Sequence, residues 1–190
     1  MYRALTLKAI RRQVNLQDEA ALIQLAQQSN IDLRGHPPHE LRVFLDGEDV
    51  TLKIREQEVT AKTFYIARTA GVREVMVRWQ RAISEKRNTV VEGRDTGTIV
   101  FPQADLKIYL DADFEERVRR RFRDLQALGQ AVELRNLKKE LKDRDKKDLT
   151  RQMGPLKKAE DAVVLDSTRL SVDQVVDRIL GLWQGHKVQG

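Results

Sequence analysis

Apolar side chains recur at the spacing of an α-helix over much of the chain. Residues 3–29 are predicted to be helical with a break around Asn15, and residues 54–86 form a second predicted helical region. The second region presents one apolar face, whose members follow the i, i+3, i+4, i+7 and i+11 pattern of a buried stripe. This face consists of Val72, Val75, Met76, Trp79 and Ile83.

Three further helices are predicted in the second half of the chain. Asp113 and Glu116 form a capping box for the first of them, and Gly129 ends it. Its apolar face consists of Phe114, Val118, Phe122, Leu125 and Leu128. The second helix is marked by Leu134, Leu137 and Leu141. The last is capped by Ser171 with Gln174, and its apolar face consists of Val172, Val175, Val176, Ile179 and Trp183.

The remaining apolar segments are typical of β-structure. Residues 31–52 alternate between apolar and polar positions and turn at Gly47, which predicts a short antiparallel hairpin. Short apolar runs at 90–91, 106–110 and 162–165 alternate with helices, which favours a parallel α/β sheet, with the first two strands at 89–93 and 106–111. Polar residues follow each run, and ligands of such sheets bind at the carboxyl ends of the strands. Three strands are fewer than the five or so that a helix-covered sheet usually has.

The composition limits the classes of partner. The 190 residues are 41% hydrophobic and 34% charged, and they contain no cysteine, so disulfides and thiolate zinc sites are excluded. The three histidines have no paired ligand spacing, so no metal site is expected from them. The net charge of +6 favours an anionic partner. No apolar run is long enough for a membrane helix, and a cytoplasmic location without a membrane partner is expected.

The loop from Gly93 to Thr98 is the first candidate for chemistry. Its glycines allow the backbone to approach a ligand closely. Arg94 could clamp an anionic group, and Asp95 could accept hydrogen bonds from an amine or a hydroxyl. A strand-to-loop turn with an Arg–Asp pair at the surface would explain the same residues.

Two charged segments are further candidates. Residues 142–151 alternate in charge and have Leu149 as their aliphatic anchor. They fit either a solvated helix end or a mobile lid that carries cations onto phosphates. Residues 117–123 contain five arginines, most of which are expected at the solvated surface, with one or two facing a ligand. The one aromatic residue among them, Phe122, belongs to the apolar face of the helix, so this cluster is a weak nucleic-acid signature.

Several separated motifs together resemble the bacterial cytidylate kinases, in the order that this family has them. The opening Met1-Tyr2-Arg3-Ala4-Leu5 resembles the family segment just after its second strand. The other matching segments are residues 89–102, 105–112 with 115–117, 144–151 with Pro155-Leu156, and 161–170. The resemblance covers nearly the whole chain.

The resemblance implies an α/β fold of the P-loop nucleoside monophosphate kinase type. A parallel-sheet core would comprise residues 1–30, 61–140 and 154–190, with a small antiparallel nucleotide-binding insert at 31–60 and a lid at 141–153. The implied activity is transfer of the γ-phosphoryl group of ATP to CMP or dCMP with Mg²⁺. The implied partners are these nucleotides, with no nucleic acid, for a monomeric protein.

The resemblance also assigns residues to roles. The substrate-binding residues would be Tyr2, Arg3, Arg73, Arg94 and Asp95. The catalytic residues of the lid would be Arg144, Asp148 and Arg151. Further phosphate contacts would come from Arg120 and Lys147. These assignments fit phosphoryl transfer, which mainly needs positioning and cations around a dispersed negative charge.

The sequence also departs from the family pattern. Thr63 stands near the place where the family has a serine, and Lys147 stands where an arginine is common. The phosphate loop of the type G-x-x-x-x-G-K-[ST] is absent, because no glycine is followed by lysine. We therefore expect the first two strands and the phosphate-loop helix to be missing, through truncation or a mis-assigned start.

Three functions remain open on this basis. The first is a cytidylate kinase that is impaired without its phosphate loop. The second is a non-catalytic remnant that holds CMP through Arg73, Arg94 and Asp95, and the third is a basic nucleic-acid-binding domain. The first two predict stabilisation by CMP, whereas the third predicts salt-dependent binding to DNA or RNA.

Overall fold

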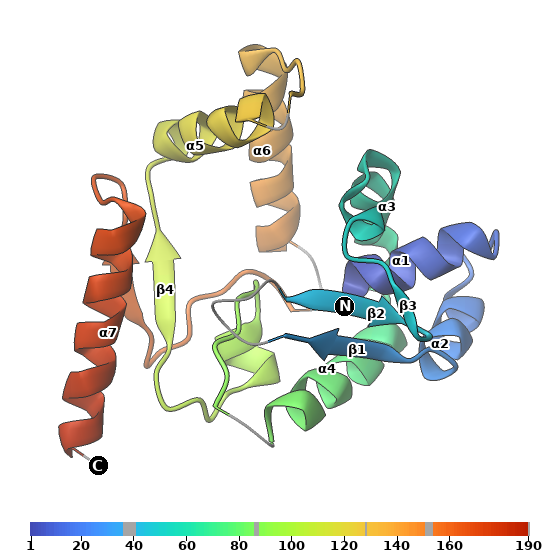
Figure 1. The fold of residues 1–190 in the computed structure, drawn as a ribbon, viewed down its shortest axis with the longest axis horizontal. Helices are drawn as coiled ribbons and strands as arrows, with labels where there is room; N and C mark the ends of the chain where they lie inside the picture. The colour runs from blue at the N-terminus through green and yellow to red at the C-terminus, as the bar shows by residue number, and fades with distance from the viewer. Residues whose placement is uncertain (36–40, 86–87, 128, 151–153, 190) are drawn as a thin grey trace. The chain divides into compact units, whose positions relative to one another are not determined.

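The computed structural model describes residues 1–35, 41–85, 88–127, 129–150 and 154–189. The chain divides into two compact units, Met1–Val90 and Val91–Gly190. Figure 1 shows the course of the chain through both units. The finer division into core, insert and lid stays a prediction.

The described residues of the first unit form four α-helices and a small sheet. The helices are α1 (Tyr2–Arg11), α2 (Glu19–Gln27), α3 (Gln57–Arg68) and α4 (Ala70–Ser84), with a short 3-10 helix η1 (Lys53–Arg55) before α3. The predicted break near Asn15 is confirmed, and Asp18 caps α2 by accepting a hydrogen bond of 3.0 Å from the Ala21 amide. The helical region 54–86 is divided at Thr69, whose extended backbone (ψ 115°) separates α3 from α4.

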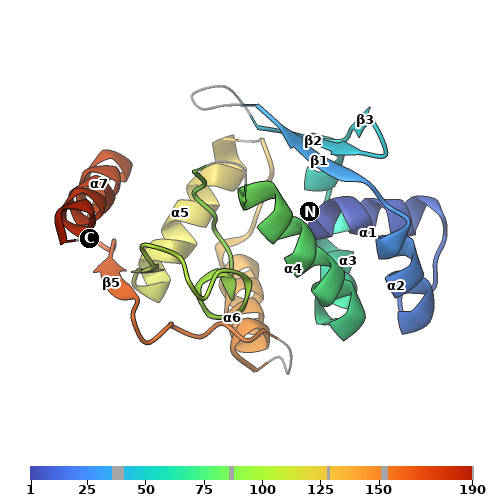
Figure 2. The ribbon, with the colours of Figure 1, turned by 90° about the horizontal axis from the view of Figure 1, so that it is seen from below.

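The predicted antiparallel hairpin is confirmed. Strands β1 (Ile31–Arg34), β2 (Arg42–Leu45) and β3 (Glu48–Asp49) form an antiparallel sheet in the order β1-β2-β3. The turn between β2 and β3 has positive φ at Asp46 and Gly47, a conformation that glycine adopts without steric cost. The sheet lies on one side of α1 and α4 (Figure 2).

One apolar core holds this first unit together. Val72, Val75 and Met76 of the predicted face of α4 are buried, and Trp79 packs partly buried against them. The sheet and the other helices contribute to the same core, which includes Leu5, Leu22, Ile31, Val43, Leu45, Val59 and Ile66. Burial of such side chains is the main force that holds the helices to the sheet.

The second unit begins with a loop and a short π-helix η2 (Thr96–Val100). Its strands β4 (Ile108–Asp111) and β5 (Val163–Asp166) pair in parallel, which confirms two of the predicted strands. The prediction of a strand at 89–93 is wrong, because residues 88–93 have no regular structure and Val90 is fully exposed. A strand requires a hydrogen-bonded neighbour, and no segment of the described chain pairs with these residues.

The two charged helices of this unit pack on each other. Helix α5 (Phe114–Ala127) follows β4 directly, and α6 (Leu134–Thr150) packs across it (Figure 1). Val118, Leu125 and Leu137 are buried between them, as the predicted apolar faces require. The predicted end at Gly129 is confirmed by its positive φ of 70°.

Of the two helix caps predicted in this unit, one is wrong and one is confirmed. The capping box at Asp113 is wrong, because the Asp113 amide donates to Thr168 Oγ1 (2.9 Å) and Glu116 pairs with Arg119 and Arg120 instead. The cap of α7 (Val172–Gln189) is confirmed by reciprocal hydrogen bonds between Ser171 and Gln174.

The apolar face of α7 is largely exposed. Val172 and Val176 are 79% and 47% exposed, and no described side chain of this helix is buried. Among the helices that the structure describes, none is long and apolar enough to cross a membrane.

Candidate functional site

Tyr2 and Arg73 lie together in the first unit. Arg73 begins the second turn of α4, and only 5% of it is exposed. Its guanidinium carbon lies 6.0 Å from the centroid of the Tyr2 ring, within the range of a cation–π contact. One of its nitrogens also donates to the carbonyl of Ala67 (3.4 Å). Burying a guanidinium is costly unless it is paired, so these contacts fix its position.

Arg3 points to a different element from its neighbour Tyr2. Its guanidinium donates to Thr60 Oγ1 on α3. Thr63 lies on the same helix and donates to the Val59 carbonyl (2.7 Å). Adjacent residues of a helix point about 100° apart, so Tyr2 and Arg3 contact different partners.

Arg94, Arg144 and Asp148 meet in the second unit. Arg94 Nε donates to Asp148 Oδ2 at 2.8 Å, and Arg144 Nε lies 3.9 Å from the same oxygen. The Asp148 side chain is 18% exposed, whereas the two arginines are more open to solvent. One carboxylate therefore lies between two guanidinium groups, which leaves positive charge available to an anion.

The loop before η2 places Arg94 and Asp95. The Asp95 carbonyl accepts hydrogen bonds from the amides of Ile99 (2.9 Å) and Val100 (3.2 Å), which close the π-helix. A Cβ atom at Gly93 would lie 2.7 Å from Thr96 Cγ2. Because Thr96 is β-branched and stiff, this close approach favours glycine at position 93.

The three remaining predicted residues have different surroundings. Arg120 donates to Glu116 Oε1 (3.1 Å) and to both the hydroxyl (3.0 Å) and the carbonyl of Ser167. Its guanidinium thus ties α5 to the end of β5, and a role in phosphate contact stays a prediction. Lys147 is exposed on α6. Arg151 lies outside the described residues.

Sequence reasoning missed one ion pair close to this cluster. Arg117 donates to Asp145 Oδ2 at 2.7 Å and, through Nε, to the carbonyl of Ala112 at 3.1 Å. The alternating charges of residues 142–151 were a signal that some of these side chains pair across helices. The sequence did not indicate which of the five arginines within residues 117–123 would pair with Asp145.

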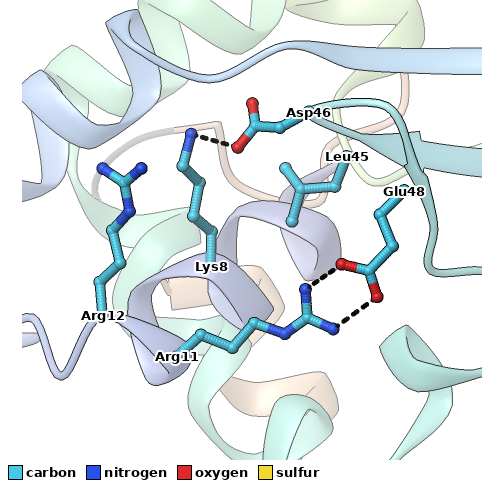
Figure 3. A pocket seen from close by; sticks show the side chains of 6 residues that line it. All are labelled: Lys8, Arg11, Arg12, Leu45, Asp46 and Glu48. Atoms are coloured by element: carbon cyan, nitrogen blue, oxygen red, sulfur yellow. Dashed lines mark hydrogen bonds and ion pairs between the residues drawn. The ribbon is translucent and has the colours of Figure 1, made fainter.

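A cavity of about 200 Å³ in the first unit contains none of the predicted site residues. Figure 3 shows two ion pairs in its lining: Lys8 contacts Asp46 at 2.6 Å, and Arg11 donates to both oxygens of Glu48 (2.7 and 3.0 Å). Hydrogen bonds from Arg11 and Lys53 lower the pKa of Glu48 to about 2. The cavity is therefore a polar junction between α1 and the β2–β3 turn.

A comparison of the whole sequence with known protein families identifies the chain's relatives. The family described as cytidylate kinase matches residues 1–185. The chain belongs to the cytidylate kinase family. The family comprises nucleotide-binding transferases and implies the P-loop nucleoside monophosphate kinase fold, for which ATP with Mg²⁺ is the usual phosphoryl donor.

Individual cytidylate kinases are similar to the chain over most of its length. The protein of that name from Desulforamulus reducens is 46% identical over 180 residues, which are 95% of this chain and 80% of the relative. The one from Geobacillus sp. (strain WCH70) is 47% identical with the same coverage. The one from Caldicellulosiruptor bescii is 40% identical over 183 residues.

Proposed function

We propose that the chain binds CMP or dCMP and is built to transfer the γ-phosphoryl group of ATP to it, which gives CDP or dCDP. The observation that carries this proposal is the family match over residues 1–185. The contact between Arg94 and Asp148 supports it, because it joins two separate motifs of the family pattern in one cluster.

The proposed roles follow from charge and position. Arg73, packed on Tyr2, would hold the phosphate or cytosine end of CMP. Arg94 and Asp95 would contact the base and the sugar. Arg144 would place its positive charge where the phosphoryl group passes between oxygens, and Asp148 would orient both arginines. Fixed cations of this kind stabilise charge that develops in the transition state.

Magnesium would enter this reaction with ATP. When bound, the ion neutralises charge on the phosphate oxygens, and it is usually held by those oxygens, by water and by one or two carboxylates. Among the described residues no group of three or more His, Cys, Asp and Glu side chains could hold a metal ion. We therefore assign the ion no ligand among the residues that the structure describes.

We further propose that the chain as printed binds CMP much better than it turns it over. Its sequence contains no G-x-x-x-x-G-K-[ST] segment, whose amides and lysine would cradle the β- and γ-phosphates of ATP. A non-catalytic CMP-binding protein is the second candidate for the same reason. The two are distinguished by adding an upstream segment with a G-x-x-x-x-G-K-[ST] loop and measuring ATP-dependent formation of CDP by chromatography: an impaired kinase should gain turnover by several orders of magnitude, and a non-catalytic protein should gain none.

Thermal unfolding with and without CMP tests the binding step. Saturating CMP should raise the melting temperature of the wild-type chain, because the ligand binds the folded state. Arg94→Gln should reduce the shift, whereas Arg121→Gln, on an exposed residue of the same charge, should preserve it. A chain that CMP does not stabilise, but that binds DNA in a salt-dependent way, would support the nucleic-acid alternative.

A further inference from the structure

Three contacts hold the Arg117 side chain at the carboxyl end of β4. Its Nε donates to the carbonyl of Ala112, the first residue after the strand, at 3.1 Å. Its guanidinium carbon lies 5.5 Å from the centre of the Phe114 ring. Its remaining contact is the ion pair with Asp145 Oδ2 at 2.7 Å. These contacts fix the Arg117 side chain next to the end of β4.

Asp145 lies in the same turn of α6 as two residues of the proposed site. Arg144 precedes it, and Asp148, which binds Arg94, follows three positions later. Residues three apart lie on neighbouring parts of a helix surface. One turn of α6 thus carries two carboxylates. Asp145 contacts Arg117 at the end of β4, and Asp148 contacts Arg94 in the loop before η2.

The apolar packing of α6 ends before this turn. Leu137 is buried against Val118 and Leu125, and Leu141 packs partly buried against the same cluster. From residue 142 to residue 150 no described side chain is buried, and Leu149 is 56% exposed. The place of Arg144 and Asp148 therefore depends mainly on polar contacts, because no buried apolar side chain anchors this turn.

We propose that Asp145 is a positioning residue: its ion pair with Arg117 holds the turn that carries Arg144 and Asp148 beside the carboxyl end of β4, and so raises the affinity for the nucleotide. The proposal rests on the proposed function. A partly exposed ion pair contributes little to global stability, so its effect should be local.

Asp145→Asn tests this proposal, with Asp143→Asn as the matched control on the exposed side of the same helix. Amide hydrogen exchange measured peptide by peptide should speed up about fivefold over residues 142–150 in Asp145→Asn. Calorimetry should show a loss of CMP affinity of similar size, with the melting temperature nearly unchanged. Asp143→Asn should match the wild type in both measurements, and Asp145→Glu should restore them.

Arg117→Gln should show at least the effects of Asp145→Asn, because it removes the same ion pair and also the contacts with Ala112 and Phe114. Adding Asp145→Asn to Arg117→Gln should change little, since the ion pair is already lost. The proposal would be overturned if Asp145→Asn left both the amide exchange of residues 142–150 and the CMP affinity unchanged. Faster exchange with unchanged affinity would also overturn it, because the pair would then tether the helix without positioning the site. If the wild type bound no nucleotide, the proposed function would fail, whereas the exchange data would still decide whether the pair holds the helix.

Discussion

Arg94 Nε and Asp148 Oδ2 lie 2.8 Å apart although 54 positions separate the two residues in the sequence. The bond joins the loop before η2 to the far half of α6. Both residues belong to motifs that the resemblance assigns to the nucleotide, and the contact brings them into one charged cluster. A charge-assisted hydrogen bond of this length is short and directional, so it fixes the arginine as well as the carboxylate.

Asp148→Asn should weaken CMP binding about tenfold, because it removes the charge that orients Arg94 and Arg144. The change keeps the shape of the side chain, so the fold should persist. Isothermal titration calorimetry with CMP measures the loss. Equal dissociation constants for Asp148→Asn and the wild type would show that the carboxylate does not organise the site.

Leu137→Ala should destabilise the second unit. The side chain is 2% exposed and packs between α5 and α6, so the truncation leaves a cavity that costs about 2–5 kcal/mol. Leu149→Ala, at a position that is 56% exposed on the same helix, should cost less than about 0.5 kcal/mol. Urea unfolding of both variants makes the comparison, and similar costs for the two would contradict the packing described.

Acid should weaken the first unit through Glu48. Hydrogen bonds from Arg11 and Lys53 lower its pKa from 4.5 to about 2 in the folded state. Because the folded pKa lies below the unfolded one, this contribution is complete above pH 4.5 and is lost as the pH falls toward 2. In Glu48→Gln, the midpoint of urea unfolding should fall less steeply across this range than in the wild type.

The control for this pH effect is Glu19→Gln, which removes an acidic side chain from the first turn of α2. That variant should keep the wild-type slope between pH 4.5 and pH 2. If the slope of Glu48→Gln were as steep as that of the control, the paired state of Glu48 would not contribute to acid sensitivity.

The helices were largely predictable from the sequence because their periodicity is local. The buried face of α4 and the cap of α7 by Ser171 and Gln174 are examples. The strand predicted at 89–93 failed because a strand depends on a partner that sequence spacing does not supply. The capping box predicted at Asp113 failed for a similar reason. Thr168, which is distant in sequence, accepts the hydrogen bond from the Asp113 amide that Glu116 was expected to accept.

The residues of the candidate site were predictable from the sequence, but the contacts between them were not. The resemblance singled out Arg94 and Asp148 separately, and the structure shows their bond. The pair between Arg117 and Asp145 escaped prediction, because five arginines lie within residues 117–123 and only the packing of α5 against α6 selects one of them.

We propose that these arginines and carboxylates hold a cytosine mononucleotide. Calorimetric titration of the folded chain with CMP measures this most directly. We expect a saturable heat with a stoichiometry near one, with weaker binding in Asp148→Asn and unchanged binding in Asp143→Asn. A well-folded preparation that gives no heat with CMP or dCMP would contradict it.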